Sequence, residues 1–151
     1  MKGLKLFIET LYLMSETIRI LIADDTLPTR QGLKALLTMM PRVKVIGQAT
    51  NGQEAVQLVD MLHPDVVLMD IQMPVMDGLE DIRRIKRRWT EVRVIALTLY
   101  ASYRDEALDA GADEFLLKGC ASKVLLDAIL KTMYGKGHAY GVQKDQEEFA
   151  T

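Results

Sequence analysis

The segment Val66–Asp70 constrains the fold of this chain more than any other. Four apolar residues in a row end in a single carboxylate, and the run lies between Pro64 and Pro74. A run this short and this apolar predicts a parallel strand buried on both faces of a sheet. Asp70 then lies where the strand leaves the sheet, and in open α/β folds this edge is where ligands bind. At that edge the Asp70 carboxylate needs a cation, a proton or a reaction partner.

Similar strands alternate with helical patterns along the chain. Apolar runs predict strands at residues 18–23, 43–49, 66–70, 92–97 and 114–117. Between and after them, apolar residues recur at helical spacing, as at Leu33, Leu36, Leu37 and Met40. Strands that alternate with helices predict the α/β class, and right-handed crossovers leave few topologies. We expect a flavodoxin-like, doubly wound (βα)5 parallel sheet with the strand order 2-1-3-4-5.

Composition narrows the class of protein. A chain of 151 residues that is 49% hydrophobic is expected to form one domain with a full core. A net charge of −2 argues against nucleic acid or an anionic membrane as the main partner. The single cysteine, Cys120, leaves no internal disulfide and suggests a reducing cytoplasm.

The chain divides into a main domain and two short ends. Residues 18–135 hold all the strands and helices of the expected sheet, and residues 136–151 form a polar tail. In residues 1–17, Leu4, Phe7, Ile8 and Leu11 fall at helical spacing. This extension is either an accessory helix or the product of a start site placed ahead of Met14, and a helix that lies on a membrane is a less favoured alternative.

Five polar residues follow the expected strands at one edge of the sheet: Asp24, Asp25, Asp70, Thr98 and Lys118. Three carboxylates this close would raise one another's pKa, and a divalent cation relieves their repulsion. Mg²⁺ prefers oxygen ligands and keeps open positions that a phosphoryl group can fill. A carboxylate can also act as a nucleophile, and Asp70 is best placed because its strand is central. Lys118 and the Thr98 hydroxyl can then contact phosphoryl oxygens.

These residues, in this order, resemble the receiver domain of two-component response regulators. The similarity covers residues 18–135, and the segments Val67–Leu79 and Phe115–Gly119 are most similar to the NarL/FixJ-type subgroup. It implies that Asp70 is the phosphoacceptor, and that Mg²⁺ is bound by Asp25 directly, by Asp24 mostly through water, by Asp70 and by the backbone carbonyl of Gln72. It also implies that Thr98 and Phe115 form a switch pair.

The resemblance implies a signalling switch whose only reactions are its own phosphorylation and dephosphorylation. The phosphoryl donor would be a sensor histidine kinase or a phosphotransfer protein, and the output surface would be the face of the fourth helix, fifth strand and fifth helix. A homodimer is a further option, and a membrane partner is not expected. An alternative is the receiver half of a truncated NarL/FixJ-type DNA-binding regulator, since the 16 residues after Gly135 are too few for a helix-turn-helix domain. This chain alone is therefore not expected to bind DNA.

An aspartyl-phosphate phosphatase is a weaker alternative, because Gln72 stands where such an enzyme has a second acid or base. Two residues depart from the common receiver pattern. Gly119 replaces the proline that often follows the lysine, which leaves the geometry of the Lys118–Gly119 peptide open. Leu99 replaces a smaller residue after Thr98 and predicts a shielded phosphoryl group that is lost slowly.

Overall fold

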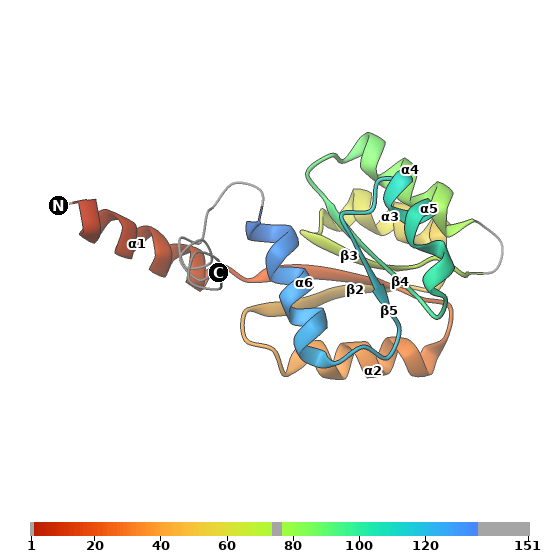
Figure 1. Ribbon diagram of the computed structural model, residues 1–151, viewed down its shortest axis with the longest axis horizontal. Helices are drawn as coiled ribbons and strands as arrows, with labels where there is room; N and C mark the ends of the chain where they lie inside the picture. The colour runs from red at the N-terminus through yellow and green to blue at the C-terminus, as the bar shows by residue number, and fades with distance from the viewer. Residues whose placement is uncertain (1, 74–76, 136–151) are drawn as a thin grey trace, which may run out of the picture.

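The computed structural model of the protein describes residues 2–73 and 77–135, without the side chains of residues 12–15. Its centre is one sheet of five parallel strands in the order β2-β1-β3-β4-β5 (Figure 1). The strands are β1 (Ile18–Ala23), β2 (Val43–Ala49), β3 (Val66–Asp70), β4 (Arg93–Thr98) and β5 (Glu114–Leu117). The predicted fold class and strand order are confirmed.

Helices cover both faces of this sheet (Figure 1). The helices that do so are α2 (Leu27–Thr38), α3 (Gly52–Leu62), α4 (Gly78–Arg88), α5 (Arg104–Asp109) and α6 (Ser122–Tyr134), with a short 3₁₀ turn η1 (Ala101–Tyr103) before α5. A further helix, α1 (Lys2–Ser15), precedes β1. One core lies between the sheet and α3, α4 and α5, and the other lies between the sheet and α2 and α6. All five residues of β3 are buried, as its apolar run predicts.

Local sequence signals explain where the helices begin. Pro28 occupies the first turn of α2, where its missing N–H costs nothing. The Asn51 side chain accepts a 2.8 Å hydrogen bond from the Glu54 amide and caps α3, and Asp77 caps α4 in the same way through the Leu79 amide. Gly111, with φ of 109°, takes the left-handed conformation just after α5.

Two predicted boundaries were wrong by short distances. β4 begins at Arg93 and includes Thr98, whereas we predicted residues 92–97. The Val92 amide is instead bonded to the Trp89 carbonyl in the turn that follows α4. The helix expected between the strands at residues 92–97 and 114–117 is split into η1 and α5. Among the described residues no peptide is cis, so the Lys118–Gly119 bond is trans.

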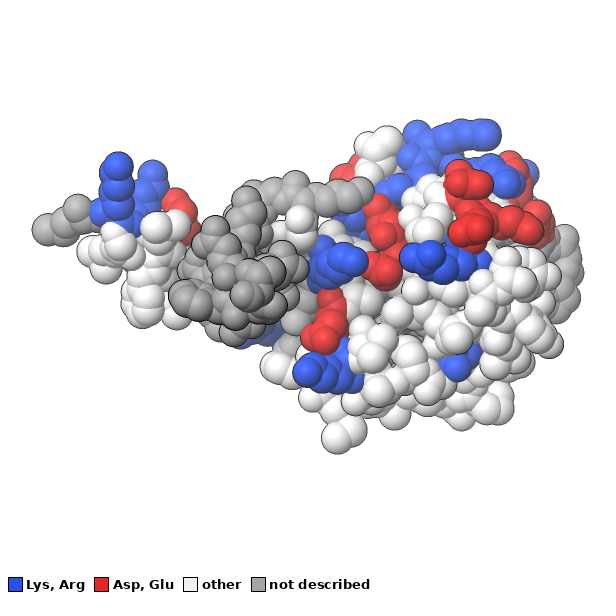
Figure 2. Space-filling view, viewed as in Figure 1, with Lys and Arg blue, Asp and Glu red and all other residues white. Residues whose placement is uncertain are grey.

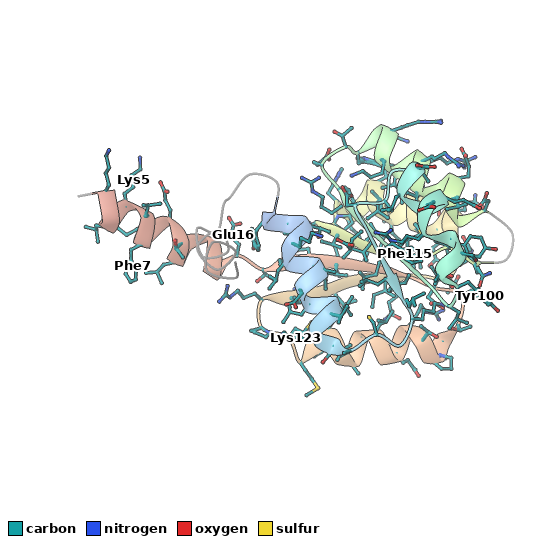
Figure 3. All side chains as sticks on the ribbon, in the orientation of Figure 1. Lys5, Phe7, Glu16, Tyr100, Phe115 and Lys123 are labelled. Carbon is teal, nitrogen blue, oxygen red and sulfur yellow. The ribbon has the colours of Figure 1, made fainter. Side chains whose placement is uncertain are left out.

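Helix α1 extends away from the sheet at the edge where β1 begins (Figure 1). Lys5 and Phe7 point to opposite sides of it (Figure 3). Its described apolar side chains of large size are exposed (Figure 2): Leu4, Leu6, Phe7, Ile8 and Leu11. Within the described ranges, no helix has both the length and the apolar character that crossing a membrane requires. The predicted tail, residues 136–151, lies outside the described residues.

Candidate functional site

The ends of four strands bring the predicted polar residues to one edge of the sheet. Asp24 follows β1 directly, Asp70 and Thr98 are the last residues of β3 and β4, and Lys118 follows β5. Parallel pairing keeps these ends level: Asp70 lies beside Leu97, and Thr98 lies beside Leu117. Strand pairing therefore assembles a site from residues almost 100 positions apart in the chain.

Three carboxylates meet at the centre of this site. One oxygen from each of Asp24, Asp25 and Asp70 lies within 4.8 Å of the others. Asp24 is 1% and Asp70 is 2% exposed, while Asp25 is half-buried. Burial raises the pKa of Asp70, and the hydrogen bonds that it accepts from Lys118 and from the Gln72 amide offset this only in part.

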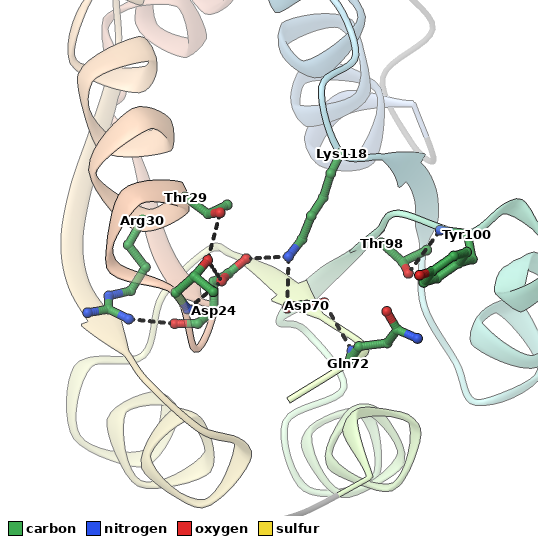
Figure 4. Close-up of polar contacts among 9 residues, drawn as sticks. Asp24, Thr29, Arg30, Asp70, Gln72, Thr98, Tyr100 and Lys118 are labelled. Carbon is green, nitrogen blue, oxygen red and sulfur yellow. Dashed lines mark hydrogen bonds and ion pairs between the residues drawn. The ribbon is translucent and has the colours of Figure 1, made fainter. Parts of the chain in front are cut away.

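Lys118 joins two of these carboxylates (Figure 4). Its Nζ lies 2.8 Å from Oδ2 of Asp24 and 2.9 Å from Oδ2 of Asp70. Burial alone would lower the pKa of Lys118, but the two carboxylates outweigh it and the pKa is raised. Lys118 therefore carries its positive charge at neutral pH, and it occupies oxygens that a metal ion would also use.

The remaining oxygens of Asp24 and Asp70 are held by backbone amides. Oδ1 of Asp24 accepts hydrogen bonds from the amide and the hydroxyl of Thr26, both at 2.9 Å. Oδ1 of Asp70 accepts one from the Gln72 amide at 3.0 Å. We expected the Gln72 carbonyl to serve as a metal ligand; the structure shows what the amide of Gln72 does, and the carbonyl role stays a prediction.

Thr98 and Phe115 lie on the neighbouring strands β4 and β5, and among the described residues neither side chain is hydrogen-bonded to the three carboxylates. Thr98 is buried, and its Oγ1 accepts a 3.3 Å hydrogen bond from the Tyr100 amide (Figure 4). Phe115 pairs with Ala96, two residues before Thr98, and its half-buried ring packs against the core on the α3, α4 and α5 side of the sheet. A switch role for this pair stays a prediction.

Arg30 and Thr26 also belong to this site, although we predicted neither of them from the sequence. Arg30 is only 9% exposed, and its Nη1 donates a 2.8 Å hydrogen bond to the backbone carbonyl of Asp24. A usable signal existed, because Arg30 lies in the first turn of α2, one helical turn beyond Thr26 and close in sequence to Asp24. Arginine on an amphipathic helix usually faces solvent, so the pattern alone did not reveal its burial.

The donor set fits a hard divalent cation. Three carboxylates and one ammonium leave a formal charge of −2 in a largely buried site, if all three carboxylates are ionised. The ligand atoms are all oxygens, which Mg²⁺ prefers to nitrogen and sulfur. Among the described residues, the Asp25 carboxylate has no hydrogen bond or ion pair, so it is free to bind such an ion.

Comparison with known proteins agrees with this geometry. The pattern of the response regulator receiver domain family matches residues 20–130. The response regulator protein VraR of Staphylococcus aureus strain Mu3 is 35% identical over 122 residues, which make up 80% of this chain and 58% of VraR. The chain thus spans less than two thirds of the length of this curated relative.

Solved structures show the same fold. The signal receiver domain of the response regulator NarL from Mycobacterium tuberculosis is 30% identical, with a TM-score of 0.75 over 80% of this chain and 99% of that one. A DNA-binding response regulator of the LuxR family from Staphylococcus aureus is 28% identical, with a TM-score of 0.72 over 77% of this chain and 98% of that one. The protein therefore belongs to the response regulator receiver domain family of two-component systems, within the NarL/FixJ-type subgroup.

Proposed function

We propose that this receiver domain is a phosphoacceptor switch and that Asp70 accepts the phosphoryl group. The observation that carries the proposal is the position of the Asp70 carboxylate. It lies at the end of the central strand, within 4.8 Å of two other carboxylates and 2.9 Å from the Lys118 ammonium. A nucleophilic carboxylate beside one fixed cation, with room for a second, suits phosphoryl transfer, which depends on positioning and charge neutralisation.

In the reaction, a carboxylate oxygen of Asp70 attacks phosphorus and forms an acyl phosphate. The bond between phosphorus and the donor nitrogen breaks, and the imidazole nitrogen keeps the electron pair. Lys118 needs only to exchange a carboxylate oxygen for a phosphoryl oxygen to stabilise the product. Bound Mg²⁺, held by Asp24, Asp25, Asp70 and the Gln72 carbonyl, would supply further neutralisation of phosphoryl charge.

The donor in this proposal is a sensor histidine kinase or a phosphotransfer protein. Thr98 would then turn its hydroxyl from the Tyr100 amide toward the phosphoryl group, and Phe115 would fill the space that it leaves. The output would be read on the face of α5, β5 and α6, where four large apolar side chains are exposed: Leu108, Leu117, Val124 and Leu130. Phosphorylation acts there only if partners bind the two states differently.

A second candidate places this receiver in a DNA-binding regulator. The LuxR-family relative is named as a DNA-binding response regulator, and VraR is longer than this chain. The switch chemistry is the same in both cases, and only the output differs. A phosphatase activity has no comparable support, because Gln72 cannot serve as an acid or base.

The test is incubation of the protein with acetyl phosphate and Mg²⁺, followed by intact-mass measurement. We expect a gain of one phosphoryl group that disappears in Asp70→Asn and in the presence of a chelator. Asp109→Asn, which changes an exposed aspartate on α5, is the matched control and should keep the gain. A phosphoryl group that persists in Asp70→Asn would show that another residue is the acceptor.

A further inference from the structure

A second cation, the buried guanidinium of Arg30, lies on the side of Asp24 away from Lys118 (Figure 4). Arg30 belongs to α2, is 9% exposed, and bonds the backbone carbonyl of Asp24 through Nη1 at 2.8 Å (Figure 4). A guanidinium is costly to bury unless its donors are used. Its placement beside the Asp24–Asp25 segment, rather than in solvent, needs a reason.

Arg30 differs from Lys118 in what it contacts. Lys118 bonds carboxylate oxygens of Asp24 and Asp70, which are the atoms that a metal ion would need. Among the described residues, Arg30 forms no ion pair with a carboxylate. It therefore leaves the metal-binding oxygens free while it holds the backbone next to them.

The bonded carbonyl controls the direction of Asp25. The carbonyl of Asp24 and the amide of Asp25 share one planar peptide unit, so holding the carbonyl fixes that plane. Asp24 is also held by its amide, which bonds Ala49 at 3.0 Å, and by Oδ1, which bonds Thr26. Among the described residues, Asp25 makes no such contacts of its own, so the direction of its carboxylate depends on the peptides on either side of it. The Thr26 amide holds the following peptide, and Arg30 holds the preceding one.

We propose that Arg30 is a positioning residue that holds the Asp24–Asp25 peptide so that the Asp25 carboxylate faces the cation site. This inference rests on the proposed function, because it assumes that the site binds Mg²⁺. Groups that orient a metal ligand without touching the metal commonly change its affinity by about 10- to 100-fold.

Two consequences of removing Arg30 have opposite signs, and this makes the inference testable. Loss of positioning weakens cation binding. Loss of a nearby positive charge strengthens it, because the site becomes more negative. A weaker affinity therefore supports positioning, whereas a tighter one indicates that Arg30 acts only through its charge.

The experiment compares Arg30→Gln, Arg30→Lys and the unmodified protein in Mg²⁺ titrations, followed by the amide NMR signals of residues 24–26. We expect Arg30→Gln to bind Mg²⁺ about tenfold more weakly and Arg30→Lys to recover part of the loss, since lysine keeps a donor for the carbonyl. Arg30→Lys also keeps the test valid if Arg30→Gln does not fold.

The matched control is Arg19→Gln. Arg19 lies near the N-terminal end of β1, at the opposite end of the strand from Asp24. It donates hydrogen bonds to the backbone carbonyls of Leu62 and His63, both at 2.7 Å. Its removal breaks bonds of the same kind and should leave Mg²⁺ affinity unchanged. Equal weakening in Arg19→Gln, or unchanged or tighter binding in Arg30→Gln, would overturn the inference. Absence of Mg²⁺ binding in the unmodified protein would instead overturn the proposed function.

Discussion

Lys118 donates a hydrogen bond to Asp70, from Nζ to Oδ2, over 2.9 Å. The same ammonium lies 2.8 Å from Asp24, so one cation already satisfies two of the three clustered carboxylates. A metal ion that enters the site has to share these oxygens with Lys118 or displace it. Lys118 therefore both prepares the site for a phosphoryl group and competes with the metal.

Replacing Lys118 should separate these two effects. In Lys118→Met we expect Mg²⁺ to bind about three- to tenfold more tightly, because the carboxylates lose their internal cation. Phosphorylation by acetyl phosphate should become slower, because no ammonium remains to contact the phosphoryl group. Mg²⁺ titration and intact-mass time courses measure both effects. Lys123→Met, which changes an exposed lysine on α6, should alter neither.

Gly52 and Asp81 form a tight contact between α3 and α4. A side chain at Gly52 would overlap the buried carboxylate of Asp81. Gly52→Ala should therefore lower the free energy of unfolding by about 1–3 kcal/mol, although alanine favours a helix. In an Asp81→Ala background the same change should cost almost nothing. Urea unfolding of the four proteins forms the double-mutant cycle, and equal costs in both backgrounds would contradict the contact.

Asp81 should also make stability depend on pH. Neither carboxylate oxygen has a hydrogen-bond partner among the described residues. Burial raises the pKa of Asp81; Arg84 opposes this, and Asp77 and Glu80 add to it. Because the folded state holds this proton more tightly than the unfolded state, the protein loses stability as pH rises from the ordinary pKa through the raised one.

Asp81→Asn should remove that loss. We expect the variant to gain stability relative to the unmodified protein as pH rises from about 4 to about 8, measured by urea unfolding at each pH. Asp109→Asn is the control, because Asp109 is solvated whether the protein is folded or unfolded. If the difference in free energy of unfolding between Asp81→Asn and the unmodified protein does not change with pH, the pKa of Asp81 is the same in the folded and unfolded states, and this prediction is wrong.

Leu99 provides a test of phosphoryl lifetime. It follows Thr98 at the edge of the sheet and is 64% exposed. If it shields the acyl phosphate from water, Leu99→Ala should speed the loss of the phosphoryl group by several-fold. The measurement is the decay of phosphorylated protein after the donor is removed. Met39→Ala changes an exposed apolar residue just after the C-terminal end of α2, and this variant should lose the phosphoryl group at the original rate.

The hydrophobic pattern predicted the strands and their order well, because buried segments require apolar residues at a spacing that can be read in the sequence. Strands β1, β2, β3 and β5 have the predicted bounds, and the polar residues at or just after the ends of β1, β3, β4 and β5 lie at one edge of the sheet. Polar contacts are harder to predict from the sequence, because the partner of a polar side chain depends on how the folded chain packs around it. Nothing in the sequence indicates that the Thr98 hydroxyl faces the Tyr100 amide, or that Arg30 bonds a carbonyl rather than a carboxylate.

The burial of Asp81 is a second feature that the sequence did not predict. Asp81 follows Glu80 and lies two positions before Arg83, and an acidic residue in such a charged helical segment is expected to face solvent. It is fully buried because Gly52, on another helix, allows a close approach that only the folded chain creates. Because Gly52 and Asp81 are distant in the sequence, no local sequence pattern predicts their contact.

Helices α1 and α6, the first and last elements of the described chain, both have an end on the side of the molecule where the strands begin. α1 leads into the start of β1, and α6 runs back from the end of β5 past the whole sheet (Figure 1). A segment attached to the free end of either helix would therefore join the domain near the starts of the strands, away from the carboxylate cluster at the strand ends. A conformational change caused by phosphorylation can reach the starts of the strands only through the strands themselves or through the helices that flank them.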